Sequence, residues 1–215
     1  MLLKKQLIIL FCLFISCNNL NSNKDKLVAK FDVLKKEENK SIYIQPFEGF
    51  PQSNTNIIEK KLKQIYSGSI IVNNAIPLPK NAKKQNRNRY CADTLIRYLG
   101  TLIKKDDLII GLTKNDISTT KDKNSDWGIF GLGYKPGKSC VVSTFKLKGN
   151  NKLEKLFKLV IHELGHNQGL ALTKNDHCTE KTCFMRAANG RDHLDELKMF
   201  CPKCKSVLIK AGWKL

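Results

Sequence analysis

The sequence contains no internal repeat, no apolar run long enough to cross a membrane, and half as many acidic as basic residues. The lack of repeats excludes a repeat architecture. The N-terminal apolar run, from Leu7 to Ile15, falls short of the roughly 20 residues that a membrane-spanning helix needs. The 19 Asp and Glu against 38 Lys and Arg leave a net charge of +19. Because the lysines are spread along the chain rather than clustered, we expect no specific nucleic-acid partner.

The first 16 residues are typical of a signal peptide, since lysines precede the apolar run and a polar stretch follows it. The sequence Phe14-Ile15-Ser16-Cys17 resembles a bacterial lipoprotein cleavage box, which would make Cys17 the first mature residue and the site of lipidation. The alternative is a plain secretory peptide in which Cys17 is incidental. We expect residues 17–40, rich in Asn and Lys, to form a flexible tether. The protein would then be lipid-anchored to a membrane of the bacterial cell envelope, facing outside the cytoplasm.

The folded domain is predicted to cover residues 41–215. Its first half alternates strands and helices, and this order favours a partly parallel sheet with helices packed on it. Next come two strand-like segments that are broken by Gly and Pro and predict a hairpin-like or edge element. The expected strands are 41–47, 69–79, 107–113, 127–138 and 139–147, and the expected helices are 56–66 and 89–104.

A long helix follows, because apolar residues recur at three- and four-residue steps from Leu153 to Leu164, after a capping Asn150 or Asn151. His162 and His166 lie four residues apart on this helix, so both imidazoles project from the same side. That spacing lets both bind one zinc ion, and Glu163 between them can accept a proton from water. The alternative is a pair of solvated histidines on an ordinary helix.

Gly169 suits a helix end that turns the chain back, because glycine adopts left-handed backbone angles without steric cost. In the three-histidine zinc proteases called metzincins, the third ligand comes three residues after such a glycine. Here that position is Leu172, which cannot bind a metal. The residues alone leave three candidates for the third ligand: His177, Asp176, or a Glu of the later segment "HLDEL", as in two-His-one-Glu sites.

Four cysteines form two pairs that are close in sequence: Cys178 with Cys183, and Cys201 with Cys204. Four thiolates match a closed tetrahedral zinc site, which is structural because no coordination position is left for a substrate. In an exported protein the alternative is two disulfides. The C-x-x-C pair also fits a redox motif, but no thioredoxin-like pattern surrounds it. The sequence does not decide whether Cys91 and Cys140 form a disulfide.

The segments "HELGHNQGL", "DHCTEKTCFM" and "FCPKC" resemble the archaemetzincins, in which H-E-x-x-H-x-x-G-x-x-H-C is followed by C-x-M and C-x-x-C. The resemblance extends over about residues 40–210. It implies an α/β (α+β), metzincin-like fold: a mixed, partly parallel twisted sheet with packed helices, a long active-site helix, and a small helical C-terminal subdomain held by zinc. Since the spacing of the cysteines to Met185 is kept, the resemblance implies that His177 is the third ligand and Met185 the Met turn.

The departure from the family pattern is a five-residue insertion between Gly169 and His177. Its residues are polar and turn-prone, and loop-closure entropy makes it cost about 0.9 kcal/mol. A zinc site contributes roughly ten times as much free energy to folding, so the insertion is compatible with zinc binding.

These observations predict a zinc-dependent peptidase with two zinc ions, one catalytic and one structural, and Glu163 as general base. By resemblance, a peptide substrate would pair with an edge strand from the 127–145 region. We expect a monomer. The first alternative is a catalytically weak or inactive surface lipoprotein that contains zinc and binds peptides; the insertion favours it and the presence of Glu163 argues against it. The second, a zinc-ribbon nucleic-acid module, conflicts with the export signal. The sequence does not reveal the cleavage specificity.

Overall fold

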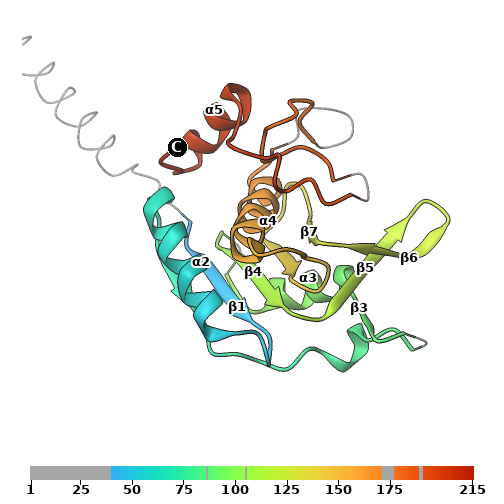
Figure 1. Ribbon diagram of the computed structural model, residues 1–215. Coiled ribbons are helices and arrows are strands. Elements are labelled where there is room, and N and C mark those ends of the chain that lie inside the picture. The colour runs from blue at the N-terminus through green and yellow to red at the C-terminus, as the bar shows by residue number, and fades with distance from the viewer. Residues whose placement is uncertain (1–39, 86, 105, 171–176, 189–190) are drawn as a thin grey trace, which may run out of the picture. The chain divides into compact units, whose positions relative to one another are not determined.

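The computed structural model describes residues 40–215, apart from 86, 105, 171–176 and 189–190 (Figure 1). The predicted signal peptide, Cys17 and the tether up to residue 39 lie outside the described residues and stay predictions. Among the described helices, none is both long and apolar enough to span a membrane. The strands are β1 (Ile42–Pro46), β2 (Ile70–Val72), β3 (Arg89–Cys91), β4 (Leu108–Thr113), β5 (Asp116–Lys121), β6 (Asn124–Ile129), β7 (Gly131–Gly133) and β8 (Ser139–Ser143). The helices are α2 (Gln52–Ile65), α3 (Ala92–Thr101), α4 (Lys152–Asn167), α5 (Pro202–Lys210) and the short 3-10 helix η1 (Lys80–Ala82).

The main sheet has five strands in the order β2-β1-β4-β8-β7. The strands β2, β1, β4 and β8 are parallel, and β7 at the edge runs antiparallel to β8. The expected mixed, partly parallel sheet is therefore confirmed. The expected edge element is confirmed for β7, which forms a hairpin-like pair with β8. The expected strand 127–138 is instead divided between β6, in another sheet, and β7, and the expected strand 139–147 gives β8, which lies inside the main sheet.

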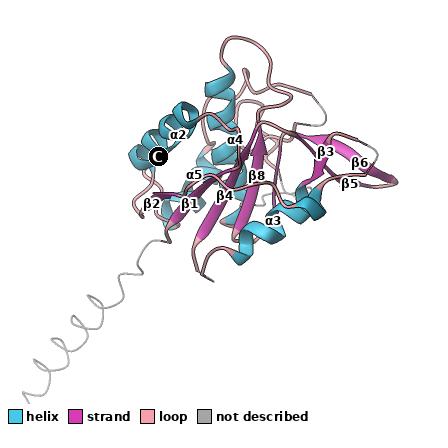
Figure 2. Ribbon diagram, turned by 90° about the horizontal axis from the view of Figure 1, so that it is seen from below, coloured by secondary structure: helices cyan, strands magenta, loops and turns pink. Residues whose placement is uncertain are grey.

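Helices cover both faces of this sheet (Figure 2). Alternate residues along β4 point to opposite faces: Ile110 packs in the core shared with α2 and α4, whereas Ile109 packs in the core shared with α3. Burial on both faces explains why these strands read as continuous apolar runs such as "LIIGL". The two cores are separate because successive side chains along a strand point to opposite faces of the sheet.

A second, three-stranded sheet in the order β3-β5-β6 was not predicted. The strand β5 reads "DISTTK" and β6 reads "NSDWGI", and neither shows the apolar alternation that marks a strand. Buried polar contacts stabilise this sheet instead. The Arg89 guanidinium donates to Asp116 Oδ2 at 2.6 Å, and the Ser118 hydroxyl donates to Asp126 at 2.6 Å.

Several predicted boundaries were wrong by a few residues. The helix α2 begins at Gln52 rather than at residue 56, because Pro51 precedes its first turn and the residues of that turn are largely polar. The strand β2 ends at Val72, well before the prolines that were expected to end it. Residues 89–91, expected to be helical, form β3, and α3 follows from Ala92.

The helix α4 matches the predicted long helix, with Asn151 at its N-cap position. The Asn151 side chain bonds Asp195 rather than capping the helix. The predicted C-terminal subdomain contains α5, and its apolar residues Leu208 and Trp213 lie in the same core as the sheet and α4. The C-terminal region therefore packs directly onto the main core.

Candidate active site and metal centres

The helix α4 presents His162 and His166 one turn apart, with their Nε2 atoms at 3.1 Å from each other. The Nδ1 atom of His162 lies 2.6 Å from the Phe184 carbonyl oxygen, and that of His166 lies 3.4 Å from the Leu170 carbonyl oxygen. A neutral imidazole that donates from Nδ1 carries a lone pair on Nε2. Two lone pairs that face each other at this distance repel, unless a cation lies beside both. The carbonyls therefore fix the histidines in the form that binds a metal.

His177 joins these two histidines. One ligand atom from each of the three lies within 4.8 Å of the others. The ring centroid of His177 is 5.3 Å from that of His162 and 4.9 Å from that of His166. The competing candidate Asp176 and the residue Leu172 lie outside the described residues. Glu196 of "HLDEL" instead accepts a 2.5 Å ion pair from Arg186.

The three imidazoles fit zinc. Nitrogens at about 2.0–2.1 Å from a tetrahedral zinc ion lie roughly 3.3 Å from each other, close to the Nε2 separation of the α4 pair. Burial and the neighbouring His166 lower the pKa of His162 to about 3, so its ring stays neutral as metal binding requires. Three protein ligands leave the fourth position of zinc open, which is the arrangement of a catalytic site.

Glu163 is buried against the edge strand β7. A Cβ atom at Gly131 would stand 2.5 Å from Glu163 Oε1, and one at Gly133 would stand 2.8 Å from the Glu163 backbone oxygen. Burial raises the pKa of Glu163 to about 8. A cation bound by the adjacent histidines favours the ionised carboxylate, since opposite charges stabilise one another.

Replacing Gly131 by Ala is expected to displace the Glu163 carboxylate, because the new methyl group would occupy its place. Misplacing a catalytic group by about 1 Å costs roughly a hundredfold in rate. If the chain is the zinc peptidase that its sequence predicts, we expect kcat for peptide hydrolysis to fall about a hundredfold with the metal content unchanged. Steady-state kinetics and metal analysis of the purified Gly131→Ala protein measure both. Wild-type kcat in this variant would show that the carboxylate position against β7 is irrelevant to turnover.

Gly169 directly follows the C-cap residue of α4, and Met185 packs against the same helix. Gly169 has φ of +87°, in the left-handed region, and nothing lies near a Cβ atom built on it, so its backbone angle alone favours glycine. Met185 is buried beneath α4: a Cβ atom at Gly165, between the two histidines, would meet the Met185 sulfur at 2.8 Å. Met185 thus forms the floor under the histidine pair.

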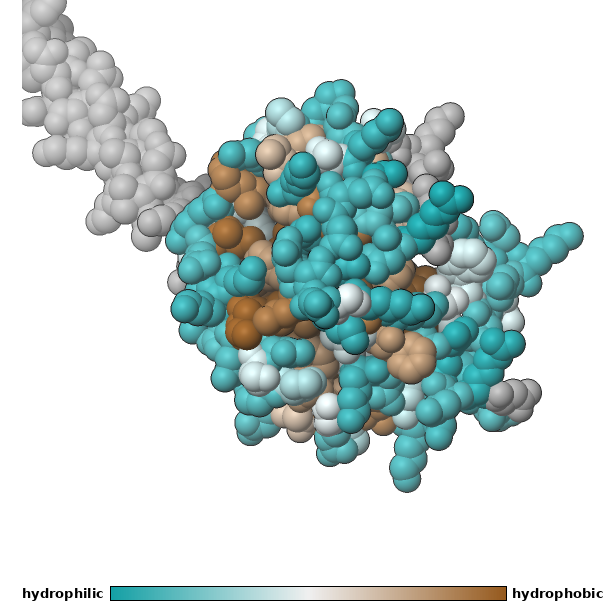
Figure 3. All heavy atoms as spheres, viewed as in Figure 1, coloured by the Kyte–Doolittle hydropathy of each residue, from teal (hydrophilic) through white to brown (hydrophobic). Residues whose placement is uncertain are grey.

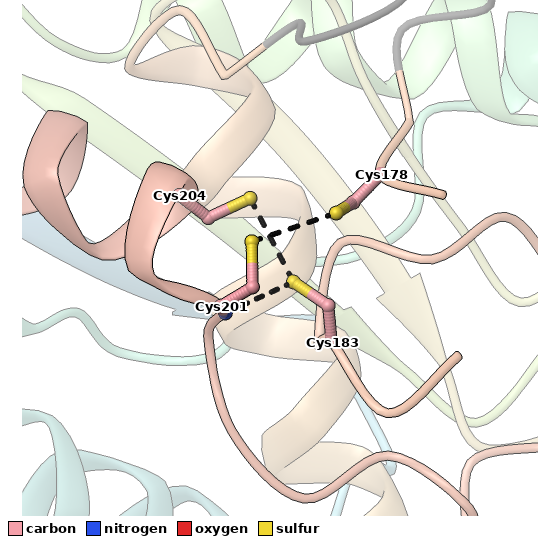
Figure 4. A group of neighbouring side chains, drawn as sticks. All are labelled: Cys178, Cys183, Cys201 and Cys204. Atoms are coloured by element: carbon pink, nitrogen blue, oxygen red, sulfur yellow. Dashed lines mark hydrogen bonds between the residues drawn. The ribbon is translucent and has the colours of Figure 1, made fainter. Parts of the chain in front are cut away.

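The four cysteines of the two predicted pairs converge in one cluster (Figure 4). The closest sulfurs are Cys178 with Cys201 at 3.6 Å and Cys183 with Cys204 at 3.7 Å, so each contact joins members of different sequence pairs. A disulfide requires sulfurs at about 2.05 Å, and all four cysteines are free. Tetrahedral zinc with Zn–S bonds of about 2.3 Å places its sulfurs about 3.8 Å apart. The cluster fits a zinc ion rather than two disulfides.

Hydrogen bonds prepare one of these thiols for metal binding. The bond with Cys204 and the backbone N–H groups of Cys201 and Met185 lower the pKa of Cys183 to about 5. A thiolate is the form that binds zinc. Such N–H groups around a sulfur are typical of a metal site, whose ligands must be held ionised.

The cysteine cluster and the histidine cluster share backbone. His177 directly precedes Cys178, whose N–H donates to the Met185 carbonyl at 2.8 Å. The Phe184 carbonyl that orients His162 lies between Cys183 and Met185 in sequence. An ion in the cysteine cluster would therefore fix both the third histidine and the orientation of the first.

Cys91 and Cys140 are separate free thiols. Cys91 ends β3 and is half-buried, whereas Cys140 is fully buried in β8. Burial raises the pKa of the Cys140 thiol well above its usual value, so this thiol stays protonated.

The histidines and Glu163 open onto a cavity of about 1260 Å³. Strands β5 to β7 form one wall of it, and residues from the segments 177–188 and 191–197 form the other. Two buried lysines of α4 anchor that second wall: Lys155 pairs with Asp192 at 2.9 Å, and Lys158 donates to the Leu194 carbonyl at 2.9 Å. His193 lines the cavity, half-buried and outside any helix, with Nε2 3.0 Å from the Ala187 carbonyl.

Sequence reasoning missed a polar network at the cavity rim. The Tyr134 hydroxyl donates to Asp93 Oδ1 at 2.5 Å and the Thr119 hydroxyl donates to Asp93 Oδ2 at 2.6 Å. Burial and the bonded Asp93 raise the pKa of Tyr134 to about 12. The network ties β5, α3 and the end of β7 together, and no spacing in the sequence connects these three residues.

Comparison with known proteins agrees with the geometry. The model of peptidase family M54 matches residues 45–210. The archaemetzincin of Nanoarchaeum equitans is 31% identical over 139 residues, which cover 64% of this chain and 73% of that protein. The crystal structure of archaemetzincin from Methanopyrus kandleri has a TM-score of 0.67 at 26% identity, over 83% of this chain and 98% of that one.

A second crystal structure, of archaemetzincin from Archaeoglobus fulgidus complexed with malonate, shares the fold with a TM-score of 0.65 at 24% identity. It covers 78% of this chain and 99% of that one. The family model spans well over half of the sequence, so the resemblance predicted from the motifs is confirmed. The chain therefore belongs to peptidase family M54, together with the archaemetzincins.

Proposed function

We propose that this chain hydrolyses peptide bonds with a zinc ion held by His162, His166 and His177 and with Glu163 as the general base. Its family makes it a zinc metalloprotease that acts on peptides or proteins. The convergence of three histidines, brought within 4.8 Å of one another, is the observation that carries the proposal. We further propose a second, structural zinc ion in the cysteine cluster, supported by the sulfur separations of 3.6 and 3.7 Å.

Zinc bound there supplies a Lewis acid that makes water nucleophilic near neutral pH and polarises the scissile carbonyl group. Glu163 follows His162 directly in sequence and lines the same cavity, so its carboxylate is placed to accept a proton from the attacking water. The same carboxyl group can then donate that proton to the leaving amine. Its burial against β7 excludes water from one side and keeps it in a single position.

The strand β7 is suited to hold an extended substrate. It forms the edge of the five-stranded sheet, pairs only with β8 among the described strands, and lines the cavity beside Glu163. A peptide that adds as a further strand would bond the free backbone groups of β7, and side-chain pockets would then set its specificity. Gly131 and Gly133 let this backbone approach the general base closely.

Removing and restoring the metal tests this function. Dialysis against a strong chelator is expected to abolish hydrolysis of a quenched fluorescent peptide, and adding zinc is expected to restore it. Metal analysis of the active protein is expected to give two zinc ions per chain. A fully loaded protein that binds peptides tightly and cleaves none would establish the peptide-binding alternative instead.

A further inference from the structure

Basic side chains dominate the charged residues that line the cavity. Among the described residues that line it, Glu163 is the only acid, and Glu163 is buried against β7. The whole chain has two basic residues for each acid, whereas this lining has five basic residues to one acid. The five are Lys121, Lys135, Lys146, Arg186 and Arg191.

Two of these basic side chains differ from the others because they are exposed and form no ion pair within the described part of the chain. Lys121 and Arg191 are exposed, and the ion pairs found among the described residues include neither. The Lys121 ammonium lies over the Trp127 ring, 5.0 Å from its centroid, so an aromatic face holds it without cancelling its charge. Both positions are therefore available to an anionic ligand.

Lys121 and Arg191 come from the two different parts of the chain that form the cavity walls. Lys121 is the last residue of β5, and Arg191 lies between Cys183 and Cys201 in the sequence. Hydrophilic residues cover the region of β5 and β6 in the view of Figure 3. A peptide that lies along β7 would pass between the two walls, with a cation on each.

Several acids lie beside the cavity without lining it, and each is engaged by other groups: Asp93, for example, accepts hydrogen bonds from Tyr134 and Thr119. Asp116 and Asp126 pair with Arg89 within the three-stranded sheet, at 2.6 and 3.2 Å. Glu196 pairs with Arg186 but does not line the cavity. The charged residues that line the cavity thus carry a net positive charge, which attracts acidic groups and repels basic ones.

We infer that this peptidase selects peptides with acidic side chains near the scissile bond, held by Lys121 on one wall and Arg191 on the other. The inference rests on the proposed function, since it names the substrate class of the same cavity. It extends that function because the zinc site and Glu163 act on any peptide bond and do not discriminate between side chains.

Matched peptides test the preference. Glu and Gln have the same shape, so two peptides that differ only by Glu for Gln at one position isolate the effect of charge. Each Glu bound by a cavity cation is expected to raise kcat/KM about two- to fivefold over its Gln counterpart, the range of an exposed ion pair. Higher ionic strength is expected to reduce this ratio, because salt screens exposed charges.

Variants distinguish the effect of the cavity cations on this ratio from the effect of the overall positive charge. In the Lys121→Gln, Arg191→Gln double variant the Glu-to-Gln ratio is expected to fall toward one. Lys123→Gln is the matched control, because Lys123 is exposed beyond the end of β5 and does not line the cavity; its ratio is expected to stay at the wild-type value. Equal rates for both peptides, or a ratio that survives the double variant, would overturn the inference.

Binding distinguishes this failure from failure of the proposed function. Binding of fluorescent Glu and Gln peptides to the zinc-loaded Glu163→Gln protein is measured without cleavage. It gives the ratio of the dissociation constants of the two peptides. Preferential binding of the Glu peptide by a wild-type protein that cleaves neither would support the charge preference and contradict the hydrolysis. Cleavage of both peptides, together with equal dissociation constants, would support the hydrolysis and contradict the charge preference.

Discussion

Replacing Glu163 by Gln is expected to lower kcat for peptide hydrolysis by a factor of about 10² to 10⁴, the usual contribution of a general base. Gln has the shape of Glu, so it fits between α4 and the glycines of β7 without displacing either. It cannot accept a proton from water at neutral pH. The zinc content and the melting temperature are expected to stay near the wild-type values, since the three histidines remain.

The control for this variant is Glu59→Gln. Glu59 lies on α2, pairs with Lys63 on the same helix, and does not line the cavity. Steady-state kinetics on one peptide with both variants measure the difference. Retention of more than a tenth of wild-type kcat in the Glu163→Gln protein would remove this residue from the chemistry.

Replacing Cys204 by Ala is expected to abolish zinc binding by the cysteine cluster and to remove most of the peptidase activity. Structural zinc contributes about 10–16 kcal/mol of binding free energy in small zinc domains, so loss of one ligand removes much of the stability of this region. Activity is expected to fall because the chain from His177 to Met185 carries both the third histidine and the Phe184 carbonyl that orients His162.

Cys91→Ala is the matched control, because Cys91 is a free thiol outside both clusters. It is expected to keep two zinc ions and full activity. Zinc analysis, thermal unfolding and peptide hydrolysis on both variants give the comparison. If the Cys204→Ala protein keeps wild-type kcat with a single zinc ion, then the cysteine cluster does not support the catalytic site.

Much of the main sheet could be predicted because its signals are local. Continuous apolar runs mark the strands buried on both faces, and the three- and four-residue spacing from Leu153 to Leu164 marks α4. The second sheet could not be predicted, because its stability comes from polar contacts such as Arg89 with Asp116, which are 27 residues apart. Only the folded chain brings such partners together.

The candidate site also combines features that could be predicted from the sequence with features that could not. The spacing of His162, Glu163 and His166 on one helix is visible in the sequence, and the resemblance pointed to His177, which the structure brings beside them. The cysteine pairs in sequence are not the closest pairs in space. The charge of the cavity walls was hidden because Lys121 and Arg191 come from distant segments, and a surplus of lysine along the whole chain masked them.

Anomalous scattering from crystals of the zinc-loaded protein, measured on both sides of the zinc absorption edge, tests the central claim directly. Two peaks per chain are predicted, one surrounded by the four cysteine sulfurs. The other is predicted at about 2.0–2.1 Å from one nitrogen each of His162, His166 and His177. A zinc ion held by His162 and His166 while His177 points away, or no ion at that position, would contradict the account.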